Sequence, residues 1–274
     1  MDFIQKLASA AGGNRSLLCI GLDPDPEMMP AGVSVIDFNK EIIKATRELV
    51  CAYKLNLAFY EALGAQCFDV IKETMEAIPG NIPVIGDAKR SDIGNTARAY
   101  AKALFENMAF DAVTVNPYLG YDSVKPFTEY SDRGVFILCR TSNPGSADFQ
   151  TVRCQDKKGP GQYLYELVAT KAAEWNQYGN IGLVVGATYP EALKVIRQSH
   201  PDMPILIPGV GAQGGDLELA VRYGADSHGQ KALIGSSRQI IYASRGKDFA
   251  RAARLAASEL RQRINEFRAD LSLR

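Results

Sequence analysis

The sequence predicts a single α/β domain, a (β/α)8 (TIM) barrel of eight parallel strands that takes in residues 1–274. Three observations lead to this prediction. Short apolar segments recur roughly every 25–45 residues, with helix-length segments between them. Most of these segments are apolar throughout, as expected of parallel strands that are covered on both faces. The length of 274 residues is close to the roughly 250 that are typical of one such barrel.

Eight segments are the expected strands, namely residues 17–23, 52–56, 82–87, 112–116, 135–139, 181–185, 204–207 and 232–235. Helical spacing is clearest in residues 3–11, 96–107 and 191–198. A doubly wound open sheet is the alternative, because the same alternation of strands and helices builds it. The most polar stretch, residues 143–162, follows the fifth strand, and we interpret it as a long active-site loop rather than a domain boundary.

The charge balance restricts the classes of partner. The 31 basic residues equal the 31 acidic ones, whereas broad nucleic-acid or membrane binding calls for a basic excess. We therefore expect neither nucleic acid nor membrane as a partner. No basic start is followed by an apolar core, and no apolar run approaches the roughly 18 residues of a membrane span. A cytoplasmic location is predicted by default.

Cysteine and histidine give no sign of disulfides or metal. The cysteines number five, an odd count with no Cys-x-x-Cys pair, and Cys19, Cys51 and Cys139 lie in apolar strand-like segments. We expect these three to be reduced interior thiols. The two histidines, His200 and His228, lie outside any cluster with ligand spacing, so no metal site is expected.

Polar residues occur where the expected strands end. They are Asp23, Lys54, Asp87, Lys89, Asn116 and Arg140. In a barrel these strand ends form one rim, and the chemistry of such enzymes takes place there. By contrast, Lys194, Arg197 and the arginine-rich residues 251–263 are interpreted as solvated helix faces.

The segment 87–93 carries the strongest local signal. Residues two apart on a strand share a face, so Asp87 and Lys89 can both point into the barrel mouth. Asp92 follows three residues after Lys89, and Lys54 ends the neighbouring strand. An alternating Lys–Asp–Lys–Asp array is then possible. Taken alone the pattern is equally typical of a solvated ion pair, but charges gathered at adjacent strand ends favour a functional site.

A second signal follows the last two strands. Four glycines in residues 208–216 let the backbone approach an anion, and Gln213 adds amide donors. Ser237 and Arg238 follow the eighth strand, and barrels frequently bind phosphate with the loops after strands seven and eight. Either motif alone is also typical of an ordinary turn, but together they favour a phosphate site.

Ser142 lies in the turn that follows the fifth strand. Its hydroxyl is a candidate for binding a polar ligand edge, although a simple hydroxyl-bearing turn is the alternative. The sequence has no histidine near it, so a serine-nucleophile mechanism is unsupported.

With these motifs together, the chain resembles the orotidine 5'-phosphate decarboxylases, and more closely the bacterial subgroup of slightly longer chains. The matching stretches run in order through nearly the whole chain: Gly21-Leu22-Asp23-Pro24, Tyr53-Lys54-Leu55-Asn56, Asp87-x-Lys89-x-x-Asp92-Ile93, Ser142-Asn143-Pro144-Gly145, residues 208–215 and Arg238. The Asp-x-Lys-x-x-Asp element alone is shared with sugar-phosphate relatives of the same superfamily. Its combination with Asp23, Gln213 and Arg238 is much more specific. One departure is Ser237, where many relatives carry glycine.

The resemblance implies cofactor-independent decarboxylation of orotidine 5'-monophosphate (OMP) to uridine 5'-monophosphate (UMP) and CO2, in de novo pyrimidine biosynthesis. It implies that Lys89 protonates C6 of the pyrimidine, that Asp87 lies beside the scissile carboxylate and that Lys54 contacts the ribose. It further implies a homodimer whose sites are shared. The remaining implied roles are Asp92 and Thr96 reaching into the partner's site, Asp23 on a ribose hydroxyl, Ser142 on the pyrimidine amide edge, Gln213 and Arg238 on the 5'-phosphate, and the Ser237 N–H beside it.

Two alternatives remain at this point. A sugar-phosphate lyase or aldolase that uses Mg²⁺ would share the barrel and the 87–92 motif, but it expects another acidic ligand where this chain has Lys54. A non-catalytic nucleotide-binding barrel would be expected to lose Lys89 or Asp87, and both are present.

Overall fold

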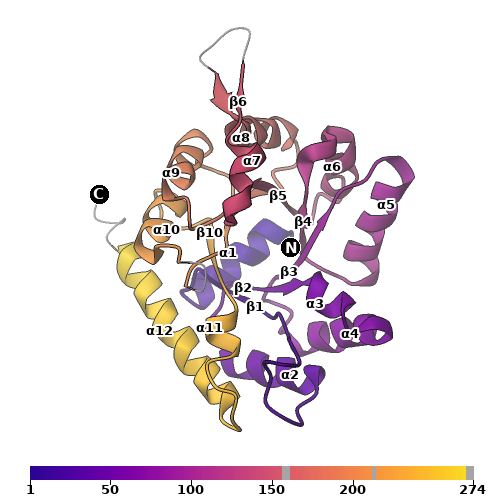
Figure 1. Ribbon diagram of the computed structural model, residues 1–274, viewed down its shortest axis with the longest axis vertical. Helices are drawn as coiled ribbons and strands as arrows, with labels where there is room; N and C mark the ends of the chain where they lie inside the picture. The colour runs from indigo at the N-terminus through magenta and orange to yellow at the C-terminus, as the bar shows by residue number, and fades with distance from the viewer. Residues whose placement is uncertain (156–160, 212–213, 270–274) are drawn as a thin grey trace.

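The computed structural model describes residues 1–155, 161–211 and 214–269, and its centre is a closed barrel of eight parallel strands (Figure 1). The first strand pairs with both the second and the last, so the open-sheet alternative is wrong. The order around the barrel is β1-β10-β9-β8-β5-β4-β3-β2. The strands are β1 (Leu18–Gly21), β2 (Ala52–Asn56), β3 (Val84–Arg90), β4 (Ala112–Val115), β5 (Gly134–Arg140), β8 (Ile181–Val185), β9 (Ile205–Ile207) and β10 (Ala232–Ser236).

Helices surround the barrel, as Figure 1 shows. Their ends follow capping chemistry: Ser34 accepts a hydrogen bond from the N–H of Asp37, and Asp216 from that of Leu219. The main ones are α2 (Val35–Thr46), α3 (Leu57–Glu61), α4 (Cys67–Ala77), α5 (Gly94–Lys102) with its π-helical continuation η2 (Ala103–Asn107), α6 (Tyr121–Thr128), α8 (Leu164–Trp175), α9 (Pro190–Ser199), α10 (Leu217–Gly224), α11 (Arg238–Ile241) and α12 (Phe249–Ala269).

The amino-terminal end of the barrel is closed by α1 (Phe3–Gly13), which lies behind the strands in Figure 1. The Phe3 ring is 2% exposed and packs edge-on against Phe136 of β5, with ring centroids 5.7 Å apart. A Cβ on Gly134 would lie 2.4 Å from the Phe3 ring, so glycine is required there. We call Phe3, Leu7, Phe136 and the strand residues packed around them the barrel floor.

Three predicted interior thiols are confirmed. Cys19, Cys51 and Cys139 are buried and free, and burial raises the pKa of the Cys19 thiol to about 12. Such thiols stay protonated and behave as small apolar groups.

Residues 143–162 are more structured than the predicted long loop. They contain η4 (Pro144–Ser146), α7 (Ala147–Gln150) and β6 (Arg153–Cys154), which pairs antiparallel with β7 (Gln162–Tyr163). The resulting hairpin projects from the barrel in Figure 1. Residues 156–160 lie outside the described part.

The prediction that Arg197 belongs to a solvated helix face is wrong. Arg197 is 8% exposed, and its guanidinium donates to five backbone carbonyls, among them those of Gly224 and Met203. Its five N–H donors thereby connect the end of α10, the residues between α9 and β9, and the residue before β10. Desolvation lowers the pKa of Arg197 to about 10, so it stays charged.

Among the described helices, none is long and apolar enough to cross a membrane.

Candidate active site

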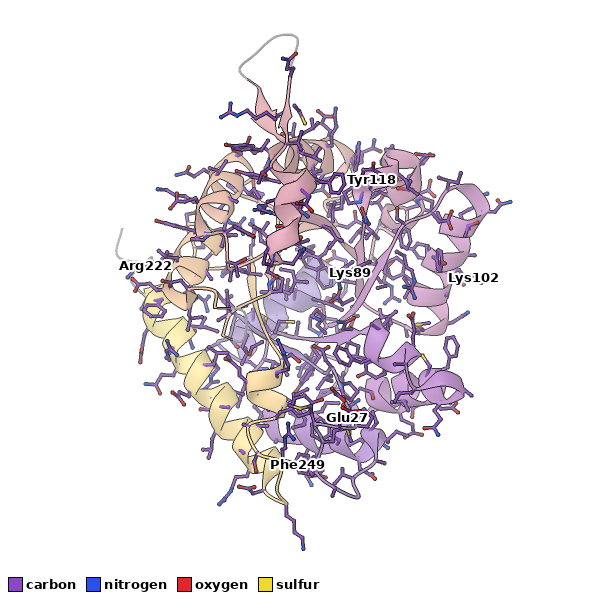
Figure 2. The ribbon with its side chains drawn as sticks, viewed as in Figure 1. Glu27, Lys89, Lys102, Tyr118, Arg222 and Phe249 are labelled. Atoms are coloured by element: carbon purple, nitrogen blue, oxygen red, sulfur yellow. The ribbon has the colours of Figure 1, made fainter. Side chains whose placement is uncertain are left out.

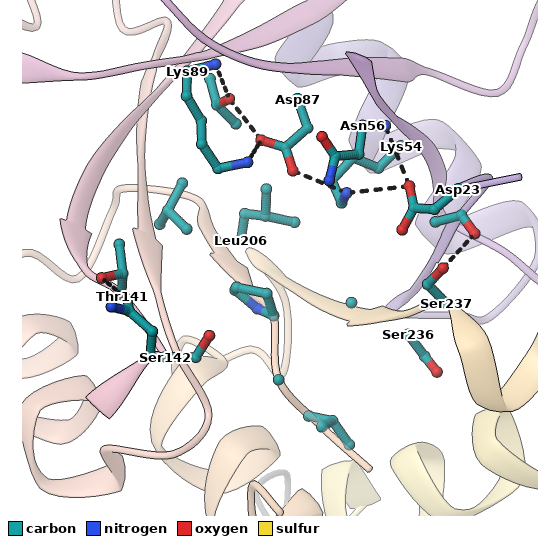
Figure 3. A pocket seen from close by; sticks show the side chains of 18 of the residues that line it. Asp23, Lys54, Asn56, Asp87, Lys89, Thr141, Ser142, Leu206, Ser236 and Ser237 are labelled. Carbon is teal, nitrogen blue, oxygen red and sulfur yellow. Dashed lines mark hydrogen bonds and ion pairs between the residues drawn. The ribbon is translucent and has the colours of Figure 1, made fainter. Parts of the chain in front are cut away.

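The carboxyl ends of the strands surround a cavity of about 510 Å3. Its lining includes residues that the sequence placed at strand ends, and Figure 3 shows several of them pointing toward one another. Figure 2 places Lys89 within the ring of helices, whereas Lys102 lies at the periphery. The predicted site residues that line the cavity are Asp23, Lys54, Asp87, Lys89, Ser142, Ser237 and Arg238.

Three neighbouring strands supply a connected row of charges. Lys54, near the end of β2, places Nζ 3.0 Å from Asp87 Oδ2 and 3.9 Å from Asp23 Oδ1. Lys89 places Nζ 2.6 Å from Asp87 Oδ1. Asp87 therefore lies between two ammonium groups, as the dashed lines in Figure 3 show. We call Asp23, Lys54, Asp87 and Lys89 the charge array.

Electrostatics keeps Asp87 and Lys54 ionised. Burial by itself raises the pKa of the Asp87 carboxyl, but the ammonium groups of Lys54 and Lys89 outweigh it and hold that pKa well below its usual range. Burial by itself lowers the pKa of Lys54, but the carboxylates of Asp23 and Asp87 outweigh it and raise that pKa. Asp87 and Lys54 therefore carry full opposite charges at neutral pH.

Lys89 reaches the cavity through an irregular stretch of backbone. The pairing of β3 with β4 shifts register between Gly86 and Arg90, and Lys89 has a positive φ of 49°. The sequence prediction that Asp87 and Lys89 share a face is confirmed, because both line the cavity. A bulge rather than regular alternation delivers Lys89 there.

The opposite side of the cavity is built by the ends of β9 and β10. Pro208, Gly209 and Val210 line it, and Gly209 has a φ of 95°, which glycine adopts without strain. Ser237 Oγ donates to the carbonyl of Gly21 at 3.1 Å, which joins this side to β1. The Arg238 side chain is exposed. Predicted residue Gln213 lies outside the described residues.

Ser142 follows β5 and lines the third side of the cavity. Its carbonyl accepts from Thr188 Oγ1 at 3.0 Å, and a Cβ on Gly186 would lie 2.6 Å from its Cα. Arg140, expected at the rim, is instead 4% exposed and lies 3.6 Å over the Tyr189 ring. Its guanidinium donates to Ser146 Oγ and Gln150 Oε1, and Arg140 is not among the described residues that line the cavity.

Comparison with known proteins identifies the family. A family model described as "Orotidine 5'-phosphate decarboxylase / HUMPS family" matches residues 16–253. This chain belongs to that family. An orotidine 5'-phosphate decarboxylase of Dehalococcoides mccartyi is 55% identical over 98% of this chain and 99% of its own length. One from Cupriavidus necator is 50% identical over 98% of this chain and 99% of its own. The predicted resemblance is confirmed.

Solved structures carry the same family name. An OMP decarboxylase of Leishmania donovani is 42% identical, covers 98% of this chain and 100% of its own, and superposes with a TM-score of 0.86. A putative orotidine-monophosphate decarboxylase of Toxoplasma gondii is 37% identical, covers 99% and 98% of the two chains, and gives a TM-score of 0.91. The predicted barrel is therefore the fold of this family.

The structure does not bring two of the predicted residues into their own chain's cavity. Asp92 and Thr96 are absent from its described lining. Asp92 is half-buried and accepts from the N–H of Ile93, while Thr96 is exposed on α5. Asn116, a strand-end residue, accepts from the N–H of Tyr118 and begins η3 (Pro117–Leu119).

Three residues with contacts to the charge array were not assigned from the sequence. Thr114 of β4 donates to Asp87, the N–H of Asn56 donates to Asp23 Oδ1, and Tyr242 donates to the carbonyl of Asp23. The signal for Thr114 was present, since it is a polar residue within an apolar strand. Nothing local marked Tyr242, because its contact joins residues 219 positions apart.

Proposed function

We propose that this chain converts OMP to UMP and CO2 by direct decarboxylation, as a step of de novo pyrimidine biosynthesis, with no cofactor. The observation that carries the proposal is the charge array, which faces a glycine- and arginine-bearing wall across one cavity. Curated relatives at 50–55% identity over nearly the whole chain carry the name of this activity.

In the proposed reaction the bond between C6 and the carboxylate carbon breaks, and its electron pair stays on C6 while CO2 leaves. Lys89 Nζ then gives a proton to C6, which yields UMP and a neutral amine that solvent reprotonates. The ammonium group of Lys89 stabilises the developing negative charge before it transfers the proton. Asp87 lies beside the scissile carboxylate and, with Lys54, holds Lys89 in place.

The far end of the nucleotide anchors it. Arg238, the backbone N–H of Ser237 and Gln213 are proposed to hold the 5'-phosphate, because a guanidinium pairs bidentately with phosphate. Such remote binding energy aligns the ring over the charge array and so supports turnover as well as affinity. Asp23 and Lys54 are proposed to bind the ribose, and Ser142 the pyrimidine amide edge.

We also propose a homodimer in which Asp92 and Thr96 complete the partner's site. These two residues are not among the described residues that line their own chain's cavity, and three apolar side chains are exposed next to Asp92 or on η3. Ile93 is 57% exposed, Tyr118 is 80% exposed and Leu119 is 47% exposed. Such a group of apolar residues is typical of an interaction surface.

The decisive experiment follows the ultraviolet absorbance of OMP after it is mixed with purified protein in EDTA. We expect loss of the pyrimidine carboxylate signal and stoichiometric UMP and CO2. An Mg²⁺-dependent sugar-phosphate lyase would be inactive in EDTA and would leave OMP unchanged. A nucleotide-binding barrel without catalysis would bind UMP but would also leave OMP unchanged. Either result contradicts the proposed reaction.

A subunit-mixing experiment tests the shared site. Lys89→Ala and Asp92→Asn are each inactive in this proposal, but a mixed dimer contains one site with both wild-type residues, so activity should return. The control mixes Lys89→Ala with Asp87→Asn, whose residues serve the same site, and no activity should return. Equal recovery in both mixtures, or a monomer in sedimentation, argues against sharing.

Two further properties stay predictions from the sequence. The assignment of residues 1–274 to one domain would be tested by limited proteolysis, which should release no stable fragment. The cytoplasmic location would be tested by cell fractionation.

A further inference from the structure

We propose that Thr114 is a positioning residue that fixes both Asp87 and the backbone of Lys89 in their working geometry. The inference rests on the proposed function, in which Lys89 is the catalytic acid. The hydroxyl of Thr114, near the end of β4, is the only side-chain group among the described residues that hydrogen-bonds both to Asp87 and to the backbone of Lys89.

The direction of these two hydrogen bonds follows from their chemistry. The backbone N–H of Lys89 can only donate, so Thr114 Oγ1 accepts it at 3.0 Å. The ionised carboxylate of Asp87 can only accept, so the single hydroxyl proton of Thr114 points to Asp87 Oδ1 at 2.8 Å. One buried hydroxyl thus joins the two functional residues from opposite sides.

Lys89 depends on such a partner because its backbone leaves the regular ladder. The register between β3 and β4 shifts from Gly86 to Arg90, so Lys89 lies within the bulge. Its φ of 49° is in the left-handed region, which L-residues with a long side chain rarely adopt. The hydroxyl of Thr114 satisfies the N–H that the bulge removes from the ladder, and this contact selects the strained conformation.

Asp87 depends on Thr114 for its orientation. Its Oδ2 is held by Lys54, while its Oδ1 accepts from both Lys89 Nζ and Thr114 Oγ1. The long side chain of Lys89 is 47% exposed, whereas Thr114 is 1% exposed on a strand. The rigid partner of Oδ1 is therefore the threonine.

The side chains that β5, β8 and β9 contribute to the cavity wall are apolar, which makes the hydroxyl of Thr114 an exception among them. The residues that line the cavity from β5, β8 and β9 are Leu138, Val184 and Leu206. A purely packing role at Thr114 would be filled equally well by valine, which has the same shape without the hydrogen bonds. Hydroxyl and methyl are not equivalent in a buried site, because the lost bonds leave the N–H of Lys89 unsatisfied.

The test compares Thr114→Val and Thr114→Ser with a matched control, Thr46→Val. Thr46 is equally buried, and within the described residues its hydroxyl bonds to Ile42 and Tyr53, which do not line the cavity. For Thr114→Val we expect kcat on OMP to fall about 10- to 100-fold, the scale of one or two lost bonds to charged or strained groups. KM and UMP affinity should change less than about threefold. Thr114→Ser should restore most of kcat, and Thr46→Val should leave kcat unchanged.

A second measurement does not depend on activity. The N–H of Lys89 should be protected from hydrogen exchange in the wild type and in Thr114→Ser, and should exchange rapidly in Thr114→Val. Unchanged kcat together with unchanged protection in Thr114→Val overturns the inference. So does an equal loss of kcat in Thr46→Val, which would indicate general destabilisation. If the wild type leaves OMP unchanged but protection depends on the hydroxyl, the proposed function fails while the positioning role stands.

Discussion

The two ends of this barrel are built from the same eight strands but use opposite chemistry. At the amino-terminal end, Phe3 and Leu7 of α1 are buried against Phe136 and fill the floor with apolar side chains. At the carboxyl end, Lys54, Asp87 and Lys89 form a row of paired charges around an open cavity. Burial of apolar side chains stabilises the floor. The charge array instead holds ions partly out of water, which costs desolvation free energy.

This difference indicates that the floor contributes mainly to stability and the mouth mainly to turnover. Burial at the floor supplies stability that the mouth does not, and the mouth retains a strained lysine and an open cavity that a stability-optimised protein would remove. Substitutions at the floor should therefore change unfolding, and substitutions at the mouth should change turnover. The predictions below test that separation.

The largest effect is expected for Lys89→Ala. Without the ammonium group there is neither a proton donor nor a positive charge beside C6, so kcat should fall by several orders of magnitude while UMP still binds. Lys171→Ala is the matched control, because Lys171 is 46% exposed and lies 2.6 Å from Glu174, much like Lys89 and Asp87. Near-normal decarboxylation by Lys89→Ala would refute its role as the acid.

Next in size is Phe3→Ala at the floor. Removing this buried ring should lower the free energy of unfolding by about 3–5 kcal/mol, because the cavity left beside Phe136 cannot collapse fully. Chemical denaturation measures this change, and kcat below the transition should stay at the wild-type value. Phe149→Ala, at a ring that is 66% exposed, should cost far less. A loss of kcat without a loss of stability in Phe3→Ala would break the separation of the two ends.

Arg238→Ala should have an intermediate effect, confined to the mouth. Loss of a charge-assisted contact to phosphate should raise the barrier measured by kcat/KM by about 1.5–3 kcal/mol, with little change in unfolding. Arg251→Ala on α12, where the side chain is 78% exposed, removes the same charge away from the cavity and serves as control. The phosphate assignment fails if orotidine without its phosphate reacts as well as OMP.

The smallest effect concerns acid stability. Because the pKa of Asp87 is lowered in the folded state, its contribution is complete above about pH 4, the ordinary carboxyl pKa, and declines as pH falls toward the folded pKa. Asp87→Asn should therefore lose less stability than the wild type between neutral pH and pH 3, by on the order of 1 kcal/mol. Asp202→Asn is the control, because this carboxylate is 93% exposed beside Lys231. The acid-induced loss of stability in Asp202→Asn should differ less from that of the wild type. If the free energy of unfolding falls equally with pH in all three proteins, the predicted sign is contradicted.

The sequence predicted the barrel because each strand buries both faces and so carries its own apolar signal. Residues 52–56 and 181–185 match β2 and β8 at both ends. The prediction for β3 ended at Asp87, whereas the strand continues to Arg90 through the bulge. A bulge is set by the neighbouring strand, so its residues alone do not reveal it. The hairpin of β6 and β7 has too few residues to show a period.

The candidate site was predictable where a charged residue lies at a strand end, as for Asp23, Lys54 and Lys89, which all line the cavity. It was not predictable where a polar residue acts through distant partners. Arg197 looks like a surface arginine because its spacing on α9 is helical, yet its partners lie as far along the chain as Lys231. Tyr242 is similar, since only the folded barrel brings it to Asp23.

The pairing of β1 with β10 has a consequence for synthesis on the ribosome. The nascent chain exposes Asp23 early, but the carbonyls of Gly21 and Asp23 acquire Ser237 and Tyr242 as partners only after those residues have left the exit tunnel. Until β10 has also emerged, the first strand has an open edge and the cavity has no wall on that side. A message truncated before codon 232 therefore yields a polypeptide with every member of the charge array but without the strand that completes the barrel.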